Sequence, residues 1–150
     1  MEILVFEVEG ERYALDTGTV REVVRAVAVS RLPGAPPIVL GVIDVRGILV
    51  PVLDLRARFG LPPRAVDPAE HFVIAEAGER AVALRVDRTV GIAEVDDASV
   101  AAPREPGADA GYAAAAARLD DGLVVIHDLR TFLGRAEAVS LDAALAEADA

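Results

Sequence analysis

The 150-residue sequence contains no cysteine, no lysine and no tryptophan. Without cysteine the protein has no disulfides, no thiolate nucleophile and no cysteine-ligated metal site. Aromatic residues make up only 4% of the chain, so the core must be packed mainly from aliphatic side chains, which are plentiful because 53% of the residues are hydrophobic. This supply suits one domain, or two small lobes that share a core.

Positive charge is also scarce. All 15 cationic side chains are arginine, and the net charge is −10. A nucleic-acid-binding protein needs a basic face to release counterions, so the charge argues against that class. No charged N-terminal region precedes an apolar run, and no apolar run reaches the roughly 18 residues of a membrane-spanning helix. We therefore expect a cytoplasmic protein that binds no nucleic acid and does not insert into the membrane.

Short apolar or alternating segments bounded by turn residues dominate the chain, and such segments are typical of β-strands. The segments expected to form strands are residues 2–9, 12–16, 38–45, 48–53, 71–76, 80–86, 90–95, 112–119 and 123–126. In the segment 80–86, the alternation predicts that Val82, Leu84 and Val86 face a core. About nine or ten short strands with regular turns fit two small barrels, so the predicted fold class is mainly β.

Four segments are less clear. Residues 19–29 fit a helical capping box, but their many valines favour a strand, and we expect one helical turn followed by a strand. Residues 112–119 are expected to form a strand despite five consecutive alanines, because the run is short and an Asp-Asp-Gly turn signal follows it. Prolines and glycines indicate a long loop at 96–111. Residues 138–150 are expected to form a helix with Ser140 as its N-cap.

Two stretches of the chain are similar to each other. Residues 50–56 (VPVLDLR) can be laid over residues 124–130 (VVIHDLR). In each copy a strand runs into an aspartate that can cap a short helix, Asp54 in the first and Asp128 in the second. The separation is too long for a solenoid repeat and suggests two similar lobes. A chance match is the alternative, because this composition generates the pattern easily.

Candidate catalytic groups are few. His127 stands beside Asp128, but neighbours on a strand point to opposite faces, so the pair would not form a dyad. The acidic pairs at 96–97 and 120–121 lack the alternating spacing and distal glutamate of a calcium loop. No zinc, phosphate-loop or nucleophile-elbow motif is present. We therefore expect no catalytic activity, no cofactor and no metal site.

Arg46 is the polar residue that most needs an explanation. It ends a long apolar strand and precedes Gly47, where the chain can reverse. If that strand alternates regularly, Leu40, Val42, Asp44 and Arg46 share one face. Either Arg46 is a turn residue in water, or it is a fixed charge beside an apolar groove where a partner docks.

The stretch LPGAPPIVLGVIDVRGILVPVLDLRARFGLP at residues 32–62 resembles the hallmark segment of the CheW family, the coupling proteins of bacterial chemotaxis arrays. The similarity continues in VALRVDRTVGIAEV at 82–95 and GLVVIHDLRTFL at 122–133, and so covers nearly the whole chain. It implies a single CheW-like domain over residues 1–150. That domain would be two SH3-like five-stranded β-barrels packed on a shared apolar layer, with short helices and a C-terminal helix. How the strands divide between the lobes stays open.

The resemblance also implies a receptor-binding site. The arginine of the family's VxNLRG motif, which lies in its receptor-contacting region, matches Arg46, and the family's V-x-E segment matches Val20 and Glu22. The residues expected at this site are Arg46, Glu22, Val20, Gly41, Val42 and Asp44. Asp44 departs from the family's asparagine and adds a charge beside Arg46. We expect Glu22 to pair with Arg46 and orient it, with the two charges within about 6 Å.

The function implied by this resemblance is that of a non-enzymatic adaptor, recruited to receptor arrays at the inner membrane. It would couple the cytoplasmic tips of chemoreceptors (methyl-accepting chemotaxis proteins) to the regulatory domain of the histidine kinase CheA. A groove between the lobes would take the receptor's helical hairpin, and the barrel ends would contact the kinase. A paralogous coupling protein of a non-chemotactic motility or developmental pathway is one alternative. Others are a regulatory module that only self-associates and, in a different class, a small ligand-binding β-barrel or a hydrolase that uses His127 and Asp128, either of which needs an enclosed polar pocket.

Overall fold

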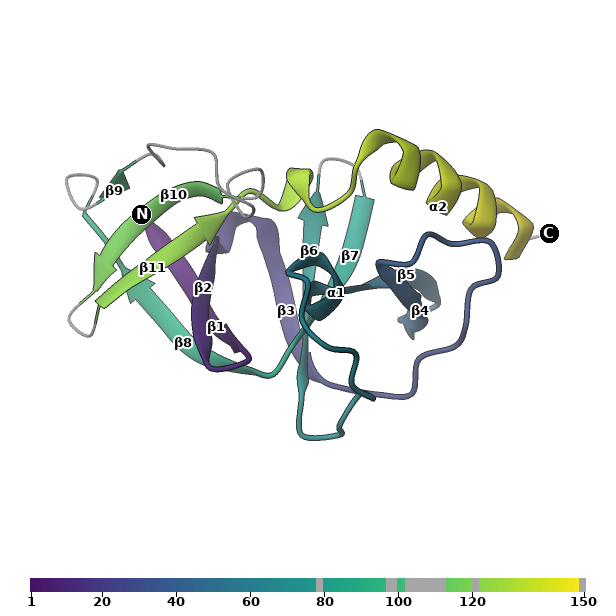
Figure 1. Ribbon diagram of the computed structural model, residues 1–150, viewed down its shortest axis with the longest axis horizontal. Helices are drawn as coiled ribbons and strands as arrows, with labels where there is room; N and C mark the ends of the chain where they lie inside the picture. The colour runs from purple at the N-terminus through teal and green to yellow at the C-terminus, as the bar shows by residue number, and fades with distance from the viewer. Residues whose placement is uncertain (78–79, 97–99, 102–112, 120–121, 149–150) are drawn as a thin grey trace.

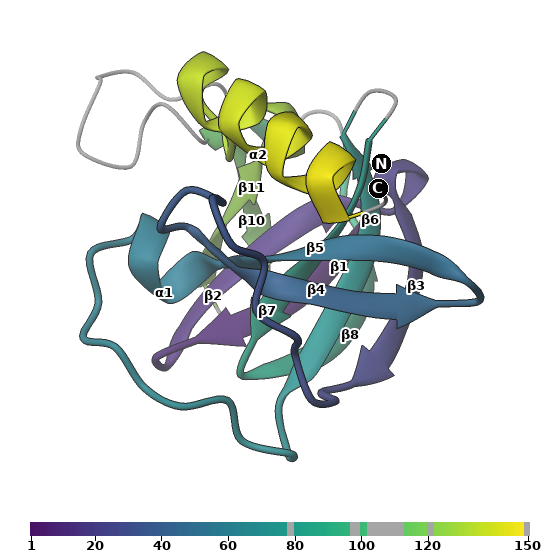
Figure 2. The same ribbon diagram turned by 90° about the vertical axis from the view of Figure 1, so that its right-hand side faces the viewer.

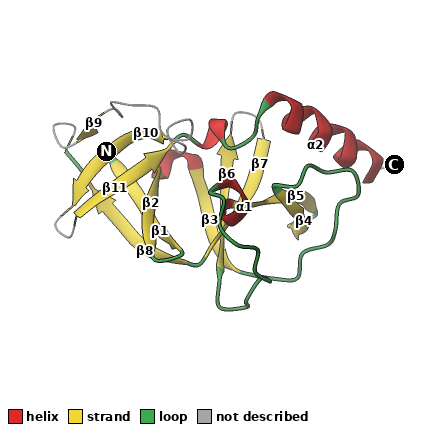
Figure 3. Cartoon of the chain, viewed as in Figure 1, coloured by secondary structure: helices red, strands yellow, loops and turns green. Residues whose placement is uncertain are grey.

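A computed structural model describes residues 1–77, 80–96, 100–101, 113–119 and 122–148. In this part of the chain the strands form two sheets that lie side by side along the long axis of the molecule (Figure 1). Strands greatly outnumber helices, as the colouring in Figure 3 makes plain, so the prediction of a mainly β fold is confirmed. Most of the loop expected at 96–111 and the turn at 120–121 lie outside the described residues.

The first sheet has the strand order β8-β1-β2-β11-β10-β9. Its neighbours pair antiparallel, except for β11 and β2, which are parallel. The two-residue β9 adds a sixth strand at one edge to the five that were expected. The strand bounds are Glu2–Val8 (β1), Glu11–Asp16 (β2), Arg88–Glu94 (β8), Val100–Ala101 (β9), Ala113–Leu119 (β10) and Gly122–His127 (β11).

The second sheet has the order β3-β6-β7-β5-β4, and here β5 and β7 are the parallel pair. Its strands are Val20–Arg25 (β3), Val39–Val45 (β4), Ile48–Asp54 (β5), His71–Ala77 (β6) and Arg80–Val86 (β7). The helices are α1 (Leu55–Arg58), α2 (Arg135–Ala148) and two short 3-10 helices, η1 (Thr17–Thr19) and η3 (Leu129–Thr131). No helix in the described ranges is long and apolar enough to cross a membrane.

The two sheets repeat one arrangement, and the chain crosses between them. Each has a central hairpin, β1-β2 or β6-β7, and a strand parallel to the second strand of that hairpin, β11 or β5. The second sheet is one continuous segment, β3 to β7, whereas the first is built from both ends of the chain. Each half of the chain, β1 to β5 or β6 to β11, therefore supplies the hairpin of one sheet and flanking strands of the other.

Three apolar clusters fill the molecule. The first sheet surrounds one cluster, made of Ile3, Val5, Ala14, Val95, Ala117, Val124 and Ile126. The second sheet surrounds another, made of Ile43, Val50, Val52, Phe72, Ile74 and Ala83. A third and larger cluster lies between the sheets and includes Leu4, Phe6, Leu53, Leu84 and Phe132. The shared apolar layer between two lobes is thus present, and separate interiors are consistent with two SH3-like barrels.

The segment after β3 closes the second sheet. The N–H of Ser30 donates to the carbonyl oxygen of Val42 at 2.9 Å, and the N–H of Val42 donates to the carbonyl oxygen of Ser30 at 2.8 Å. These bonds join the continuation of one edge strand to the other edge strand, β4. Gly41 permits the approach, because a Cβ at this position would lie 2.1 Å from the carbonyl oxygen of Ser30. The backbone contact needs glycine here.

A register shift just before Gly41 also changes which way the side chains of β4 point. Leu40 packs against the interior of the second sheet together with Ile43, whereas Val42 belongs to the layer between the sheets. The expectation that Leu40, Val42, Asp44 and Arg46 share one face is therefore wrong. An extra residue in one strand reverses the alternation beyond it, and alternation alone does not reveal the bulge.

The similarity between residues 50–56 and residues 124–130 extends to their structures. The carboxylate of Asp54 accepts a hydrogen bond from the N–H of Arg56, and that of Asp128 accepts one from the N–H of Arg130, both at 3.0 Å. The two aspartates have similar backbone angles, φ −91° and ψ 101° against φ −88° and ψ 107°. Both predicted caps are confirmed, although the second helix is only the 3-10 turn η3.

Two helix boundaries differ from the prediction. The helical turn near residue 19 is η1, capped by Asp16, and the strand begins at once with Val20. Helix α2 begins at Arg135, so Ser140 lies inside it and is not its N-cap. The carboxylate of Glu137 reaches back to accept from the N–H of Gly134 at 2.8 Å. A glycine has no capping side chain, so the sequence carries no signal at this start.

Helix α2 packs on the second sheet, above β4 and β5 (Figure 2). Leu141 and Ala144 are buried in the shared layer, with Leu145 packed against it. Arg58 holds Glu137 at 2.6 Å, and Arg80 holds Asp142 at 2.6 Å. The helix is therefore a fixed part of the second lobe.

Candidate interaction site

The turn between β4 and β5 sets the position of Arg46. Arg46 has φ 52° and Gly47 has φ 84°, as in the tight hairpin turns that match the twist of paired strands. Oδ1 of Asp44 accepts a hydrogen bond from the N–H of Gly47 at 2.7 Å. Few non-glycine residues adopt this backbone conformation. The geometry of the turn sets the direction in which the Arg46 side chain leaves the lobe.

Glu22 on β3 holds the Arg46 side chain. Nη1 of Arg46 lies 2.9 Å from Oε2 of Glu22, so the predicted pairing is confirmed. The Arg46 side chain is nevertheless 77% exposed, against 28% for Glu22. The ion pair thus orients the guanidinium while leaving most of its surface to solvent, where a partner can reach it.

An apolar hollow lies next to this ion pair, at one end of the second lobe. It has a volume of about 50 Å³ and is lined by Arg21, Glu22, Val45, Arg46, Ile48, Val50, Ile74 and Ala81. Ile48 is 61% exposed, so a large apolar side chain stands at the surface beside the hollow. The hollow, the exposed Ile48 and the fixed guanidinium together resemble the apolar centre and charged rim of a protein interface.

Three of the other four predicted site residues do not form part of this surface. Gly41 and Val42 are buried, and Val20 is half-buried against the shared layer. These three can shape the lobe, but their side chains do not present a surface. Asp44 is exposed, and its carboxylate stabilises the turn rather than pairing with Arg46. Of the six predicted residues, the structure brings Arg46, Glu22 and Asp44 together at the surface.

A buried ionic cluster near the end of β5 far from Arg46 was not predicted. Nε of Arg85 lies 2.6 Å from Oε1 of Glu70, and Nη2 of Arg85 donates to the carbonyl oxygen of Ala65 at 3.1 Å. The core positions predicted on β7 are confirmed, but Arg85 is buried on the opposite face. The sequence does carry a signal for this burial. The strand has apolar residues on both faces, so both faces are expected to be buried. An arginine within such a strand then requires a buried partner.

His127 and Asp128 are both explained by packing and capping. The His127 ring lies among the rings of Tyr13, Phe59 and Phe132, with centroid separations of 5.2, 5.4 and 5.4 Å. Hydrogen bonds from the side chain of Arg130 lower the pKa of Asp128, although partial burial opposes them. In the described part of the chain, no three acidic or histidine side chains gather as a metal site would require.

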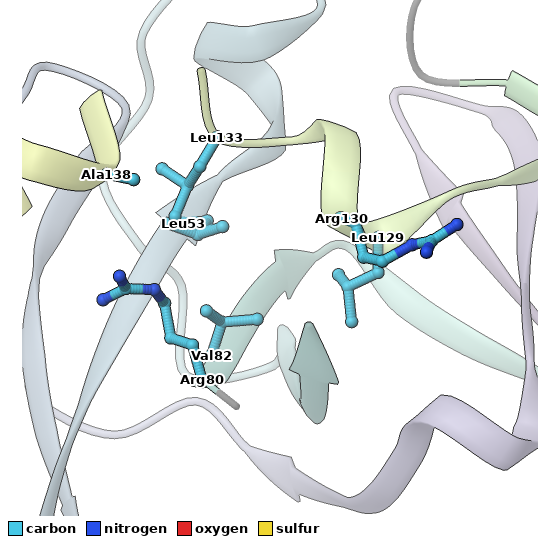
Figure 4. Close-up of a pocket in the computed structure, with 7 residues that line it drawn as sticks. All are labelled: Leu53, Arg80, Val82, Leu129, Arg130, Leu133 and Ala138. Carbon is cyan, nitrogen blue, oxygen red and sulfur yellow. The ribbon is translucent and has the colours of Figure 1, made fainter. Parts of the chain in front are cut away.

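A larger hollow, of about 190 Å³, lies among β5, β7, η3 and α2 (Figure 4). Its lining consists of Leu53, Arg80, Val82, Leu129, Arg130, Leu133 and Ala138. Both guanidinium groups turn away from its centre, and they pair with Asp142 and Asp128. A ligand site needs polar groups that converge on the cavity, so this hollow does not fit the ligand-binding barrel considered above.

Comparison with known proteins identifies the family of this chain. The family model of the CheW-like domain matches residues 2–137. The chain belongs to the CheW-like domain family. All six predicted site residues fall within the matched stretch.

Individual CheW proteins agree with this assignment. The chain is 30% identical to the chemotaxis protein CheW of Bacillus subtilis, over 65% of this chain and 63% of that protein. It is 34% identical to CheW of Rhizobium meliloti, over 66% of this chain and 64% of that protein. The chain thus spans somewhat less than two thirds of the length of these relatives. The crystal structure of the scaffolding protein TtCheW from Thermoanaerobacter tengcongensis superposes with a TM-score of 0.84 and 29% identity, over 91% of this chain and 94% of that one.

Proposed function

We propose that this CheW-like domain is a non-enzymatic adaptor that couples the cytoplasmic tips of chemoreceptors to the regulatory domain of the histidine kinase CheA. The observation that carries the proposal is the exposed Arg46 guanidinium, held by Glu22 beside an apolar hollow. A positioned arginine next to exposed apolar side chains is typical of the residues that dominate protein interfaces. Membership of the CheW-like family supports chemotaxis signalling as the setting.

The receptor would dock at the end of the second lobe, where Arg46 and the hollow lie, and not in the groove between the lobes that the resemblance implied. Apolar side chains of a receptor helix would cover Ile48 and Val45, while Arg46 donates to a carboxylate or carbonyl at the edge of the contact. Glu22 would keep the guanidinium in place, which lowers the entropy lost on binding. Val20, Gly41 and Val42 would act indirectly, by maintaining the shape of the lobe.

The kinase domain would use the ends of both lobes. Leu49 on β5 and Leu123 on β11 occupy equivalent places when residues 50–56 are laid over 124–130. Leu49 is 37% exposed and Leu123 is 69% exposed. Each lobe thus offers an apolar side chain at the second residue of a strand, which suits one transient contact at each end. Control of the kinase would follow from its position beside the receptor.

Co-sedimentation tests this function. The wild type is mixed with membranes that carry a chemoreceptor, with and without the kinase regulatory domain, and compared with Arg46→Ala. We expect Arg46→Ala to weaken receptor binding about tenfold, as loss of a central interface residue does. The matched control is Arg118→Ala, because Arg118 is an exposed arginine on β10, in the other lobe. Thermal melts establish that all variants are folded.

The outcomes separate the alternatives. If Arg46→Ala and Arg118→Ala bind receptor membranes as well as the wild type, the site is wrong. If folded wild type binds neither receptor nor kinase domain, the chemotaxis function is wrong. Binding to a kinase domain from a motility or developmental pathway, and not to the chemotaxis kinase, would identify a paralogous coupling protein.

A further inference from the structure

The short segment between β3 and the closing residue Ser30 leaves its backbone unpaired. The N–H of Ala26 donates to the carbonyl oxygen of Glu70 at 2.9 Å, and Ser30 is bonded to β4. Between these two residues, the backbone of residues 27–29 makes no hydrogen bond to any described group of the protein. Three successive residues just beyond the edge strand β3 therefore present free donors and acceptors, which form a template for a further strand.

An apolar groove runs along the same segment. Its volume is about 420 Å³, within the usual range of about 300–1,000 Å³ for binding clefts. One wall is residues 26–29, and the other comes from the linker after α1, which runs past this segment (Figure 1). Every lining residue is apolar, namely Ala26, Val27, Ala28, Val29, Val66 and Pro68. Val27 is 52% exposed, so the groove is open to a partner.

Two arginines flank this groove. Arg25 precedes the unpaired segment and Arg31 follows it, and both are exposed. Neither makes an ion pair or a side-chain hydrogen bond within the described part of the chain. The nearest carboxylate in sequence on the opposite wall, Asp67, accepts a hydrogen bond from the N–H of Ala69. In a protein of net charge −10, two uncompensated cations beside an apolar groove favour an acidic partner.

We infer that this groove binds an extended acidic peptide segment of a partner protein. The peptide adds as a strand to residues 27–29, its small apolar side chains pack on Val27, Val66 and Pro68, and its flanking carboxylates pair with Arg25 and Arg31. Strand addition of this kind takes affinity from backbone bonds and specificity from alternate side chains. A helix would leave the free donors and acceptors of residues 27–29 unpaired, because its own backbone groups are already bonded.

This site is separate from the adaptor function proposed above. Its lining shares no residue with the hollow beside Arg46. Arg46→Ala should therefore leave peptide binding unchanged, and failure of one proposal does not imply failure of the other.

A phage-displayed library of random short peptides, selected on the full chain, tests the inference. We expect enrichment of peptides with two or three β-branched residues between acidic ones. The double variant Arg25→Glu/Arg31→Glu should bind the enriched peptides about tenfold more weakly, the loss expected for two partly exposed ion pairs. The matched control is Arg118→Glu, which reverses an exposed arginine on the other lobe. Its affinity should match the wild type.

Two further measurements identify the binding mode. Methylation of alternate backbone nitrogens in an enriched peptide should abolish binding, since the side chains remain but the strand bonds cannot form. Amide hydrogen exchange at residues 27–29 should be fast in the free protein and slow in the complex. Absence of enriched acidic peptides, equal binding by the double variant, or protection at other residues would each overturn the inference. Competition between peptide and concentration-dependent self-association would also overturn it, because the groove would then belong to a second copy.

Discussion

Nε of Arg85 lies 2.6 Å from Oε1 of Glu70, and the two side chains are only 1% and 4% exposed. Nη1 of Arg85 also lies 3.5 Å from Oδ2 of Asp54, the residue that caps α1. The cluster joins the linker before β6 to β7 and to the end of β5. We infer that this buried ionic cluster stabilises the second lobe, which carries the candidate site.

Removal of the charge from Glu70 should destabilise the protein at neutral pH. Glu70→Gln leaves Arg85 buried with a weaker partner, and the loss of one member of a buried pair costs about 3 kcal/mol. Urea unfolding at pH 7 measures the free energy of unfolding directly. Glu94→Gln is the control, because the Glu94 side chain is 72% exposed and pairs with the N-terminus. Equal losses in the two variants would contradict the assigned role.

The same pair predicts how stability depends on pH. Burial by itself raises the pKa of Glu70, but hydrogen bonds from Arg85 and from the N–H of Asp67 outweigh it and leave the pKa below its ordinary value of 4.5. A lowered pKa in the folded state means that stabilisation is complete above the unfolded pKa and is lost as pH falls through the folded pKa. The difference in free energy of unfolding between wild type and Glu70→Gln should therefore shrink below about pH 4.5. A constant difference down to pH 3 would contradict this account.

Gly41 should tolerate substitution less well than Gly47. A Cβ at Gly41 would meet the backbone of Ser30, whereas a Cβ at Gly47 meets no atom within 4 Å. Gly47→Ala should cost about 1 kcal/mol, from its φ of 84° alone. Gly41→Ala should cost at least about 3 kcal/mol, because the backbone must move and the Ser30–Val42 pairing breaks. Chemical denaturation of both variants compares them, and a similar loss at the two positions would argue against the closure of the lobe at Gly41.

The pair of Arg46 and Glu22 should matter for binding more than for stability. Exposed ion pairs contribute less than about 1 kcal/mol, so each alanine variant should unfold almost as the wild type does. In the receptor assay Glu22→Ala should weaken binding less than Arg46→Ala does. It should have no further effect in the Arg46→Ala background, because Glu22 acts through Arg46. An additive loss in the double variant would mean that Glu22 contacts the receptor itself.

The two equivalent caps should respond differently to removal of charge. Asparagine is a good N-cap, so Asp128→Asn should change the free energy of unfolding by less than about 0.5 kcal/mol. Asp54→Asn keeps the cap but weakens the contact with Arg85, and should cost about 2 kcal/mol. Thermal unfolding at pH 7 measures both. Equal effects would indicate that Asp54 acts only as a cap.

Much of the fold could be predicted because its signals are local. Alternation and turn residues locate the strands, and even the alanine-rich β10 follows from the turn signal after it. The aspartates that cap α1 and η3 are visible for the same reason, since their partners lie two residues away. The pairing of Arg46 with Glu22 required the family resemblance, because the two residues are far apart in sequence.

The remaining features depend on contacts that local patterns do not contain. The bulge before Gly41 comes from the chain passing at Ser30, and alternation along β4 alone could not place Leu40. The start of α2 uses Glu137 and a glycine backbone in place of a capping side chain. The burial of Arg85 and the unpaired backbone of residues 27–29 follow from how β3, β6 and β7 assemble into a sheet.

The placement of the second sheet within the chain has a consequence for synthesis. All its strands lie in one continuous stretch, from Val20 to Val86, so it can assemble on the ribosome while the rest is still being made. The hairpin β1-β2 must wait for its partners β8 and β11, which are both synthesised after the second sheet. Arg46, Glu22 and the Arg85 cluster all belong to the earlier lobe, so the candidate site can take shape before its neighbour is complete.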